Sequence, residues 1–361
     1  MSNFNLYPHN KESYEKIKEG FESSNIVGIV HATGTGKSFN ALEYVSDNTD
    51  ENILYVVPSL GIIEHLKNII AKSGFVLEKD FPNLKFCTYM SFVNLSREEL
   101  KNIKVDTLIL DEFHHLGAPV WGSRINTLIK THSNIKVLGM TAYTVRDRNT
   151  PYERDMANPD TAELFSNHIV SRYDLCDAMV DGVLPKPIYK TAYVNLLEDV
   201  DYLEKRLDNL DHNTSKYIDC EKVLTDVKRQ IANALSMKEL VKKNLKSNGK
   251  YIYFCPMMSE KNVNDIDTIM KEAKGWFLEM GLTEEEIVFY KSTSEMGTLG
   301  KKNREAFYND IDLDNRDTSN KLRVMFAINQ YNEGVHAPNV DGVILGRSTC
   351  SDIVYFEQIG R

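Results

Sequence analysis

The stretch His31-Ala32-Thr33-Gly34-Thr35-Gly36-Lys37-Ser38 decides the fold of the first half of this chain. It follows an apolar run at 26–30 and precedes a mixed run at 39–45. The apolar run predicts a buried strand, and the mixed run predicts a helix. Small residues between them let consecutive backbone N–H groups converge on one ligand, and a helix N-terminus adds partial positive charge. The sequence therefore predicts a strand, a glycine-rich turn and a helix start that together cradle a polyphosphate.

The residues expected to line this loop are Thr33, Gly34, Thr35, Gly36, Lys37 and Ser38. Lys37 supplies a full positive charge, and the hydroxyl of Ser38 is suited to Mg²⁺. The strict pattern G-x-x-x-x-G-K-[ST] requires glycine at position 31, where this chain has His31. The tight turn depends on Gly34 and Gly36, so the departure leaves the chemistry intact. A glycine-containing loop with a chance lysine is the alternative, which the flanking strand and helix disfavour.

Length and composition describe an ordinary globular protein of two domains. The chain has 361 residues, of which 42% are hydrophobic and 26% charged. Its five cysteines are scattered, with no C-x-x-C pair, and we interpret them as reduced thiols of a cytoplasmic protein. The N-terminal segment lacks the apolar core of a signal peptide, and no apolar segment is long enough to span a bilayer. We therefore expect no membrane contact.

The net charge of −9 argues against a protein that coats nucleic acid through charge alone. The acidic residues are concentrated in stretches such as 198–201 and 310–317. Other faces are therefore left neutral or basic, and a local basic groove stays compatible with the sequence.

A second motif follows another apolar run. Residues 105–110 predict a buried strand, which ends in Asp111-Glu112-Phe113-His114. One of two adjacent carboxylates can hold a metal ion, and the next can polarise an attacking water. A surface Asp-Glu pair is common, but a pair after a buried strand, combined with the glycine-rich loop, predicts a Mg²⁺-nucleotide site. The pair His114 and His115 does not predict zinc, because neighbouring side chains point differently and no third ligand is near in sequence.

Strands and helices alternate along the chain, which predicts a doubly wound α/β architecture with ligands at the carboxyl ends of the strands. In the first half we expect strands at 53–57, 84–89 and 137–140, and helices at 11–21, 62–71, 155–170 and 175–180. In the second half we expect strands at 251–255, 287–290, 322–327 and 341–345, and helices near 263–280 and 304–309. Between the halves, residues 198–248 carry apolar side chains at helical intervals, which predicts two helices joined near 212–214.

The N-terminal segment lies just before the loop, where a purine base can be held. Tyr7 is suited to stacking on a base, and Asn10 to reading its edge. The alternatives are an exposed tyrosine and a helix N-cap asparagine. Both interpretations stay open at this point.

The order of these motifs resembles the DExH-type superfamily-two helicases and translocases, over nearly the whole chain. The narrower likeness is to such proteins of bacteria, phages and mobile elements, including the motor subunits of restriction systems. The segments that match the family's successive motifs are 31–38, 57–59, 88–89, 111–114, 141–143, 253–255, 332–336 and 358–361. Any one of the later matches is weak, whereas their order over two α/β halves is specific.

The resemblance implies two tandem RecA-like parallel-sheet domains with a helical insertion between them. We expect the first domain at 1–190, the linker and helical hairpin at 191–248, and the second domain at 249–361. The family's last motif normally continues beyond the Gly-Arg pair at which this sequence stops. We therefore expect the second domain to be incomplete and the chain alone to hydrolyse ATP poorly.

The resemblance also implies roles for individual residues, with ATP in the cleft between the two domains. Lys37 would contact the β- and γ-phosphates, Ser38 and Asp111 would hold Mg²⁺, and Glu112 would position the attacking water. The other catalytic residues are Gln358 and Arg361, of which the arginine would stabilise the charge of the transition state. The residues expected to couple the motifs are His114, Thr141 and Gly334. The residues expected to meet the sugar-phosphate backbone of nucleic acid are Pro58, Ser59, Thr88, Ser292 and Thr293.

The function so implied is a nucleic-acid-dependent ATPase that unwinds or translocates along its track, with DNA favoured over RNA. An ATP-gated nucleic-acid clamp or assembly factor is the alternative. Two departures from the family pattern keep this alternative open. Tyr143 replaces the usual hydroxyl residue at the end of the 141–143 motif, and the last motif is incomplete. An unrelated phosphate-loop kinase or transporter ATPase leaves the ordered motifs of the second half unexplained. A nuclease or another subunit is a candidate partner, through the helical insertion or the region after Arg361.

Overall fold

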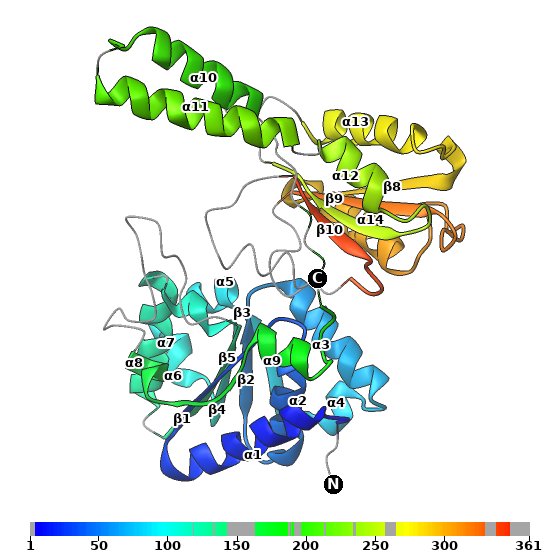
Figure 1. Ribbon diagram of the computed structural model, residues 1–361. Coiled ribbons are helices and arrows are strands. Elements are labelled where there is room, and N and C mark those ends of the chain that lie inside the picture. The colour runs from blue at the N-terminus through cyan, green and yellow to red at the C-terminus, as the bar shows by residue number, and fades with distance from the viewer. Residues whose placement is uncertain are drawn as a thin grey trace. The chain divides into compact units, whose positions relative to one another are not determined.

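The computed structural model describes residues 4–117, 119–132, 134–142, 163–186, 188, 190, 196–212, 214–233, 236–256, 265–328 and 337–346. These residues form two compact units (Figure 1). The first contains the described residues from 4 to 186, and the second contains most of those from 188 to 346. Each unit has its own parallel sheet, as the α/β interpretation predicts. The domain boundaries that we expect at 190 and 248 stay predictions.

The described residues of the first unit form one sheet of six parallel strands. They are β1 (Ile26–His31), β2 (Ile53–Val57), β3 (Leu84–Thr88), β4 (Thr107–Asp111), β5 (Lys136–Thr141) and β6 (Ile169–Tyr173). Their order across the sheet is β3-β2-β4-β5-β1-β6. The glycine-rich loop follows β1 and the two carboxylates end β4, so both motifs lie at the carboxyl edge. Strand β5 lies between these two strands and ends at that same edge.

Helices cover both faces of this sheet (Figure 1). One face carries α1 (Pro8–Ser23), α2 (Lys37–Asp47), α3 (Leu60–Lys72) and α4 (Leu77–Asp80). The other face carries α5 (Tyr89–Val93), α6 (Arg97–Asn102), the 3₁₀ helix η1 (Phe113–Gly117), α7 (Pro119–Thr131) and α8 (Glu163–Ser166). Helix α9 (Leu175–Val180) follows β6 and matches the helix expected there.

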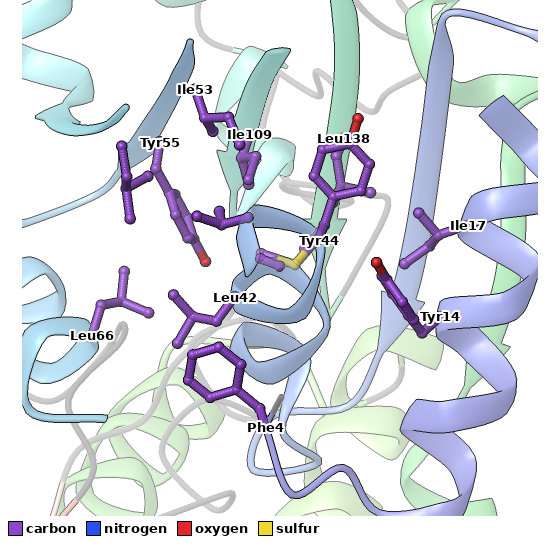
Figure 2. Packing of buried hydrophobic residues seen from close by; sticks show 14 of the residues in the cluster. Phe4, Tyr14, Ile17, Leu42, Tyr44, Ile53, Tyr55, Leu66, Ile109 and Leu138 are labelled. Carbon is purple, nitrogen blue, oxygen red and sulfur yellow. The ribbon is translucent and has the colours of Figure 1, made fainter. Parts of the chain in front are cut away.

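Alternate residues of the central strands supply the two cores of this unit. In β2, Tyr55 packs with the core under α1, α2 and α3, whereas the next residue, Val56, packs with the core under α5 and α7. Figure 2 shows the first of these cores, in which Phe4 and Leu42 lie near Tyr55 and Leu66. Each large apolar side chain buried in this way contributes about 1.5–3 kcal/mol. Burial on both faces explains why these strands read as continuous apolar runs in the sequence.

One expectation for the first unit is wrong. We expected a helix over 155–170, but α8 ends at Ser166, and Ile169 and Val170 begin β6, which pairs in parallel with β1. The cause is a contact between segments distant in sequence, because Gly28 of β1 lets this segment approach closely. A Cβ at Gly28 would lie 2.8 Å from Ile169. Pairing with β1 therefore outweighs the local helical pattern, and residues 155–162 lie outside the described part of the chain.

The second unit has a four-stranded parallel sheet in its described part. Its strands are β7 (Lys250–Phe254), β8 (Ile287–Thr293), β9 (Leu322–Ile328) and β10 (Gly342–Leu345), in the order β10-β7-β9-β8. Its other elements are α13 (Ile266–Leu278), α14 (Gly297–Tyr308) and the 3₁₀ helices η2 (Glu284–Glu286) and η3 (Ser294–Met296). All four strands were expected from the sequence. Helix α14 begins seven residues before the segment that we expected at 304–309, because Gly297 to Asn303 lack a clear apolar period.

In its described residues, the charged segment before this sheet contains three helices rather than two. Helices α10 (Leu196–Asp208) and α11 (Ser215–Asn233) are the expected pair. The third, α12 (Met237–Asn244), begins after Ser236, whose side chain forms a capping box with Glu239. Val241 of α12 packs in the core of the second unit, against the side of the sheet that carries α13. The sequence merged α12 with α11 because the apolar period continues through both.

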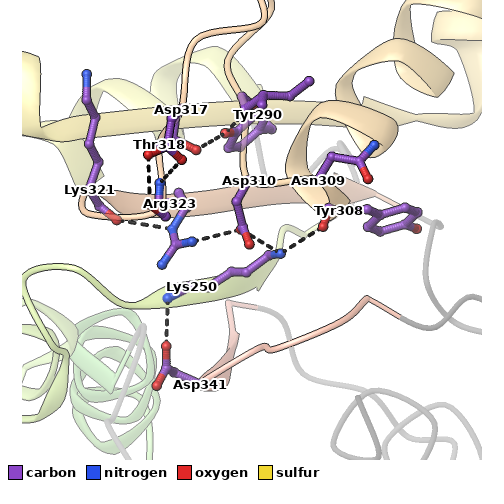
Figure 3. Close-up of polar contacts among 12 residues, drawn as sticks. Lys250, Tyr290, Tyr308, Asn309, Asp310, Asp317, Thr318, Lys321, Arg323 and Asp341 are labelled. Atoms are coloured by element: carbon purple, nitrogen blue, oxygen red, sulfur yellow. Dashed lines mark hydrogen bonds and ion pairs between the residues drawn. The ribbon is translucent and has the colours of Figure 1, made fainter.

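A buried ion pair holds the amino ends of β7 and β9 together (Figure 3). Lys250 is fully buried, and its Nζ lies 2.8 Å from Oδ1 of Asp310. The same carboxylate oxygen accepts a hydrogen bond from Arg323 at 2.7 Å. The backbone N–H of Lys250 donates to Asp341 at 3.0 Å. Burial lowers the pKa of Lys250, and the hydrogen bond to Asp310 opposes that shift. Asp310 therefore compensates the positive charges of Lys250 and Arg323 at this edge.

We expect Asp310→Asn to lower the free energy of unfolding of the second unit by about 3 kcal/mol, the usual cost of breaking a buried ion pair. Urea unfolding followed by the fluorescence of Trp276, in a Trp121→Phe background, reports on this unit. Asp314→Asn is the matched control, because Asp314 pairs with Arg316 at the exposed surface of the same loop and exposed pairs contribute about 0–1 kcal/mol. Equal losses in the two variants would contradict the prediction.

Candidate functional site

The loop after β1 has the backbone that a phosphate cradle requires. Gly34 and Gly36 have φ angles of 84° and 85°, in the left-handed region that favours glycine. A Cβ at Gly36 would also lie 2.7 Å from Nδ2 of Asn10. Helix α2 begins at the next residue, Lys37. Both glycines that the sequence placed at the turn are therefore required by its conformation.

His31 stands where the strict pattern has glycine, and its side chain is 1% exposed. Its Nε2 is hydrogen-bonded to Oγ of Ser171 in β6 at 2.9 Å, and its ring lies 5.7 Å from that of Tyr173. Burial, and then the charge of Lys37, lowers the pKa of His31 to about 3, so the ring is neutral at pH 7. Strand β6 thus accommodates the irregular residue, which the sequence did not reveal because Ser171 is 140 positions away.

Two side chains of helix α1 hold the loop through one of its carbonyl groups. Nδ2 of Asn10 donates to the carbonyl of Thr35 at 2.9 Å, and Nε2 of His9 lies 2.7 Å from the same oxygen. The ring of His9 stacks on Tyr173 at 4.3 Å and 8°. Asn10 is fully buried, whereas Tyr7 is 56% exposed beside His9. Asn10 therefore holds the loop in this structure, and its predicted contact with a base stays a prediction, as does that of Tyr7.

A buried lysine and a buried glutamate face each other at the loop. Nζ of Lys37 lies 3.7 Å from Oε1 of Glu112 and donates to the carbonyl of His31 at 3.0 Å. Burial alone would raise the pKa of Glu112, but Lys37, and then His114 and His115, outweigh it and lower that pKa below the usual range. The carboxylate is therefore ionised in a site that excludes most solvent.

The backbone at Glu112 is strained. Its φ angle is +50°, which few residues other than glycine adopt. Its backbone N–H donates to Oδ1 of Asp111 at 3.1 Å, and the hydroxyl of Tyr89 donates to the carbonyl of Asp111 at 2.9 Å. Strain of this kind persists only where neighbouring groups fix the conformation, and it is concentrated at functional sites.

The end of β5 touches the same carboxylate. The hydroxyl of Thr141 donates to Oε2 of Glu112 at 3.2 Å, and Nδ1 of His114 lies 2.8 Å from that hydroxyl oxygen. Nδ1 of His114 is also 3.5 Å from Oε2. The structure thus brings Thr141 together with Glu112 and His114, which the sequence placed in a different motif.

Ser38 and Asp111 approach the same buried tyrosine. Tyr55 is fully buried in β2, and burial, followed by the charge of Asp111, raises its pKa well above the usual value, while Ser38 opposes the shift. Thr35, by contrast, turns its hydroxyl back to the carbonyl of Ala32 at 2.7 Å.

The residues expected to contact nucleic acid in the first unit lie at the carboxyl ends of β2 and β3. Ser59 is the N-cap of α3, and its side chain makes no capping hydrogen bond. Thr88 is buried, and its hydroxyl caps α5 by accepting from the backbone N–H of Ser91 at 3.1 Å. Ser91 is exposed and lies 2.8 Å from that hydroxyl. The sequence therefore missed Ser91 as the more accessible hydroxyl, which the N-cap pattern T-x-x-S signals.

Two large apolar side chains are exposed at the same edge. Leu60 directly follows Ser59 and is 69% exposed, and Met90 follows Tyr89 and is 60% exposed. Pro58, between β2 and Ser59, is partly exposed. At the ends of β2 and β3, this edge therefore combines hydroxyl groups with exposed apolar side chains.

In the second unit, Ser292 and Thr293 end β8, at the carboxyl edge of that sheet. Ser292 is fully buried, and its hydroxyl accepts a hydrogen bond from Arg304 at 2.8 Å. Thr293 is partly exposed, and its side chain makes no capping hydrogen bond. Only Thr293 therefore offers an accessible hydroxyl here. The predicted residues Gly334, Gln358 and Arg361, together with Tyr143, lie outside the described residues.

Two further observations concern the described part of the chain. Among these residues, no cluster of three or more His, Cys, Asp or Glu side chains could hold a metal ion. No helix among them is long and apolar enough to cross a bilayer.

The first unit matches a known family. Residues 3–146 match the family described as type III restriction enzyme, res subunit. This segment contains the glycine-rich loop, the Asp111-Glu112 pair and Thr141. No curated protein matches the sequence.

Three solved structures share the fold. An ATP-dependent type ISP restriction-modification enzyme, LlaBIII, bound to DNA, matches 99% of this chain and 26% of its own, at 16% identity and a TM-score of 0.61. The DEAH/RHA helicase HrpB of Escherichia coli matches 93% of this chain and 36% of its own, at 13% identity and 0.56. The Hef helicase domain of Pyrococcus furiosus matches 97% of this chain and 91% of its own, at 13% identity and 0.52.

The chain spans about a quarter of the length of the restriction enzyme and about a third of the length of HrpB. The family match covers the loop and the carboxylates, and the three neighbours share the fold. The chain therefore resembles the res-subunit family over residues 3–146 and shares its fold with a restriction enzyme and two helicases.

Proposed function

We propose that this protein is a nucleic-acid-dependent ATPase that acts as a helicase or translocase. The observation that carries the proposal is the buried Lys37 ammonium, 3.7 Å from the ionised Glu112 and at the foot of a loop with two left-handed glycines. A buried cation and a buried carboxylate at the edge of a parallel sheet are suited to a polyphosphate and an attacking water. Nothing in the core packing requires either charge.

The proposed roles follow from where each group lies. Lys37 would exchange its hydrogen bond to the carbonyl of His31 for one to the β- and γ-phosphates of ATP. The Ser38 hydroxyl and the Asp111 carboxylate are oxygen donors of the kind that Mg²⁺ prefers, and they would hold it. Glu112 would orient the attacking water. Bound Mg²⁺ would neutralise charge on the phosphates.

The proposed coupling depends on the carboxylate of Glu112. Because Thr141 and His114 share its Oε2, a shift at the end of β5 changes the direction in which Glu112 presents its oxygens. Gln358, Arg361 and Gly334 stay proposed catalytic and coupling residues on the resemblance alone.

The proposed track is nucleic acid, with DNA favoured over RNA. Ser59, Ser91 and Thr293 offer accessible hydroxyls that bind phosphates without reading bases, as a motor on arbitrary sequence requires. The restriction enzyme that shares the fold was determined bound to DNA, which supports that preference. We also propose a cytoplasmic location and a nuclease or other subunit as a partner.

Two substitutions test the nucleotide site. Lys37→Ala is expected to abolish ATP hydrolysis and to weaken binding of a fluorescent ATP analogue, because it removes the charge that faces the phosphates. Glu112→Gln is expected to keep the analogue bound while lowering the hydrolysis rate roughly 10²- to 10⁴-fold, the range for a lost general base. Lys72→Ala, on the exposed end of α3, is the control. Full hydrolysis in either site variant would refute the proposed site.

The track is tested by the ATPase rate with single-stranded DNA, duplex DNA, single-stranded RNA and no nucleic acid. We expect single-stranded or duplex DNA to raise the rate most, since hydrolysis is proposed to depend on an occupied track. A rate that none of the three polymers changes would contradict the motor function. Displacement of a labelled strand with ATP would support unwinding. Tighter DNA binding with ATP but no displacement or movement would favour the clamp instead.

The neutral state of His31 makes stability depend on pH. Its pKa is about 3 in the folded protein and about 6.5 in an unfolded chain, so the unfolded state takes up the extra proton between these values. Because of this residue, the free energy of unfolding should therefore fall by about 1.4 kcal/mol per pH unit as the pH falls below about 6. We expect His31→Gln to flatten the fall in unfolding free energy between pH 7 and 5, measured by urea titration. His212→Gln, in an exposed loop, should leave the slope unchanged, and an unaltered slope in His31→Gln would refute the assignment.

A further inference from the structure

Tyr89 joins the nucleic-acid edge of the first unit to the strained glutamate. It directly follows Thr88, the last residue of β3, and is the first residue of α5. In the sheet order β3-β2-β4, its side chain reaches past the end of β2 to the end of β4. There its hydroxyl donates to the carbonyl of Asp111 at 2.9 Å. One residue of the track edge thus holds the peptide group between Asp111 and Glu112.

That peptide group sets the direction of the Glu112 side chain. Its carbonyl is held by Tyr89, and its N–H is held by Oδ1 of Asp111 at 3.1 Å. The left-handed backbone at Glu112 is unfavourable for a residue with a Cβ, so it needs such restraints. Rotation of the peptide would move the carboxylate away from Lys37 and Thr141. The Tyr89 hydroxyl is a restraint on this peptide group that comes from another element, helix α5.

The ring of Tyr89 is fixed by two further aromatic groups. It stacks on Trp121 of α7 at 5.1 Å and 9°, and His115 lies 5.8 Å from Tyr89 and 5.0 Å from Trp121. The backbone N–H of His115 donates to the carbonyl of Glu112 at 3.0 Å. Tyr89 is 1% exposed. A packed side chain of this kind transmits a displacement of α5 instead of absorbing it.

The outer side of α5 faces solvent through the two residues that follow Tyr89. Met90 is 60% exposed, and Ser91 is exposed, with its N–H bonded to the Thr88 hydroxyl. A ligand held by Ser91 or Met90 would therefore act on the first turn of α5. The contact surface and the buried hydroxyl are at most two residues apart on one short helix.

We propose that Tyr89 is a positioning residue that couples occupancy of the nucleic-acid edge to the orientation of Glu112. This inference rests on the proposed ATPase function and names its regulation. Nucleic acid at Ser91 and Met90 shifts α5, the Tyr89 hydroxyl shifts the Asp111 carbonyl, and Glu112 turns toward the attacking water. Tyr89 itself touches neither nucleotide nor nucleic acid.

Tyr89→Phe removes the hydroxyl and keeps the ring on Trp121. We expect the ratio of DNA-stimulated to basal ATPase rate to fall roughly three- to tenfold, the change expected from one lost hydrogen bond. The fall should lie in kcat, with the KM for ATP within about twofold of wild type. Tyr44→Phe is the matched control, because it removes a buried hydroxyl that bonds Glu51 at 3.1 Å near the amino edge of the sheet. Its stimulation ratio should equal that of wild type.

A second measurement reports on α5 without hydrolysis. The chain has two tryptophans, so a Trp276→Phe background leaves Trp121 as the only one, stacked on Tyr89. Adding a DNA oligonucleotide should change Trp121 emission both in this background and with Tyr89→Phe added. The midpoint of that change should agree within about twofold, because the hydroxyl is not part of the binding surface.

The outcomes separate the inference from the function on which it rests. A lost stimulation ratio with retained DNA binding supports the inference. A wild-type ratio in Tyr89→Phe, equal losses in basal and stimulated rates, or Trp121 emission that DNA leaves unchanged would each overturn it. If the unsubstituted protein hydrolyses no ATP, or no nucleic acid stimulates it, the proposed function fails first and the inference fails with it.

Discussion

The candidate site of the first unit depends on keeping one carboxylate charged where water is nearly absent. Burial disfavours the ionised form of Glu112, and its backbone adds strain through a positive φ angle. The compensation comes from four places: Lys37 after the loop, Thr141 at the end of β5, His114 in η1, and Tyr89 at the start of α5. These groups come from four segments that span 104 positions of the sequence, from Lys37 to Thr141. The sheet brings them together because parallel strands place their carboxyl ends at one edge.

The same geometry explains why contacts within the protein fix the conformation of the loop without a ligand. Lys37 is held by the carbonyl of His31 and by Glu112, and the loop carbonyl at Thr35 is held by Asn10 and His9. Each of these contacts is polar and replaceable. A polyphosphate would take over the lysine without disturbing the apolar core beneath α2. The loop is therefore preorganised by bonds that the proposed substrate can exchange, which limits the reorganisation that binding requires.

The sequence predicted those features that are local. Three such signals depend only on about ten neighbouring residues. They are the glycines at Gly34 and Gly36, the lysine at a helix start, and the acidic residues after a buried strand. All described strands but β6 could be predicted from apolar runs, because strands buried on both faces leave that pattern. The sequence also brought Glu112, His114 and Thr141 into one hypothesis, through the order of motifs rather than through any contact.

What the sequence did not predict depends on contacts between distant segments. The hydrogen bond from His31 to Ser171, the stacking of His9 on Tyr173, and the reach of Tyr89 to Asp111 leave no periodic signal. Strand β6 was missed for the same reason, since it pairs with β1, whose sequence lies about 140 positions away. Whether a side chain is buried also cannot be predicted from the residues next to it in sequence. Thr88 and Ser292 stand at strand ends as expected, yet their hydroxyls are occupied inside the protein.

In each unit, an ion pair at the amino edge of the sheet adds stability away from the edge where chemistry is proposed. In the first unit, Glu51 pairs with Lys136 at 2.6 Å, at the amino end of β5. In the second, Lys250 and Arg323 share Asp310 at the amino ends of β7 and β9. Charges at the carboxyl edge are instead held by contacts that a ligand can replace. This division lets the amino edge supply stability while the carboxyl edge keeps the strain and the exchangeable contacts that a working site needs.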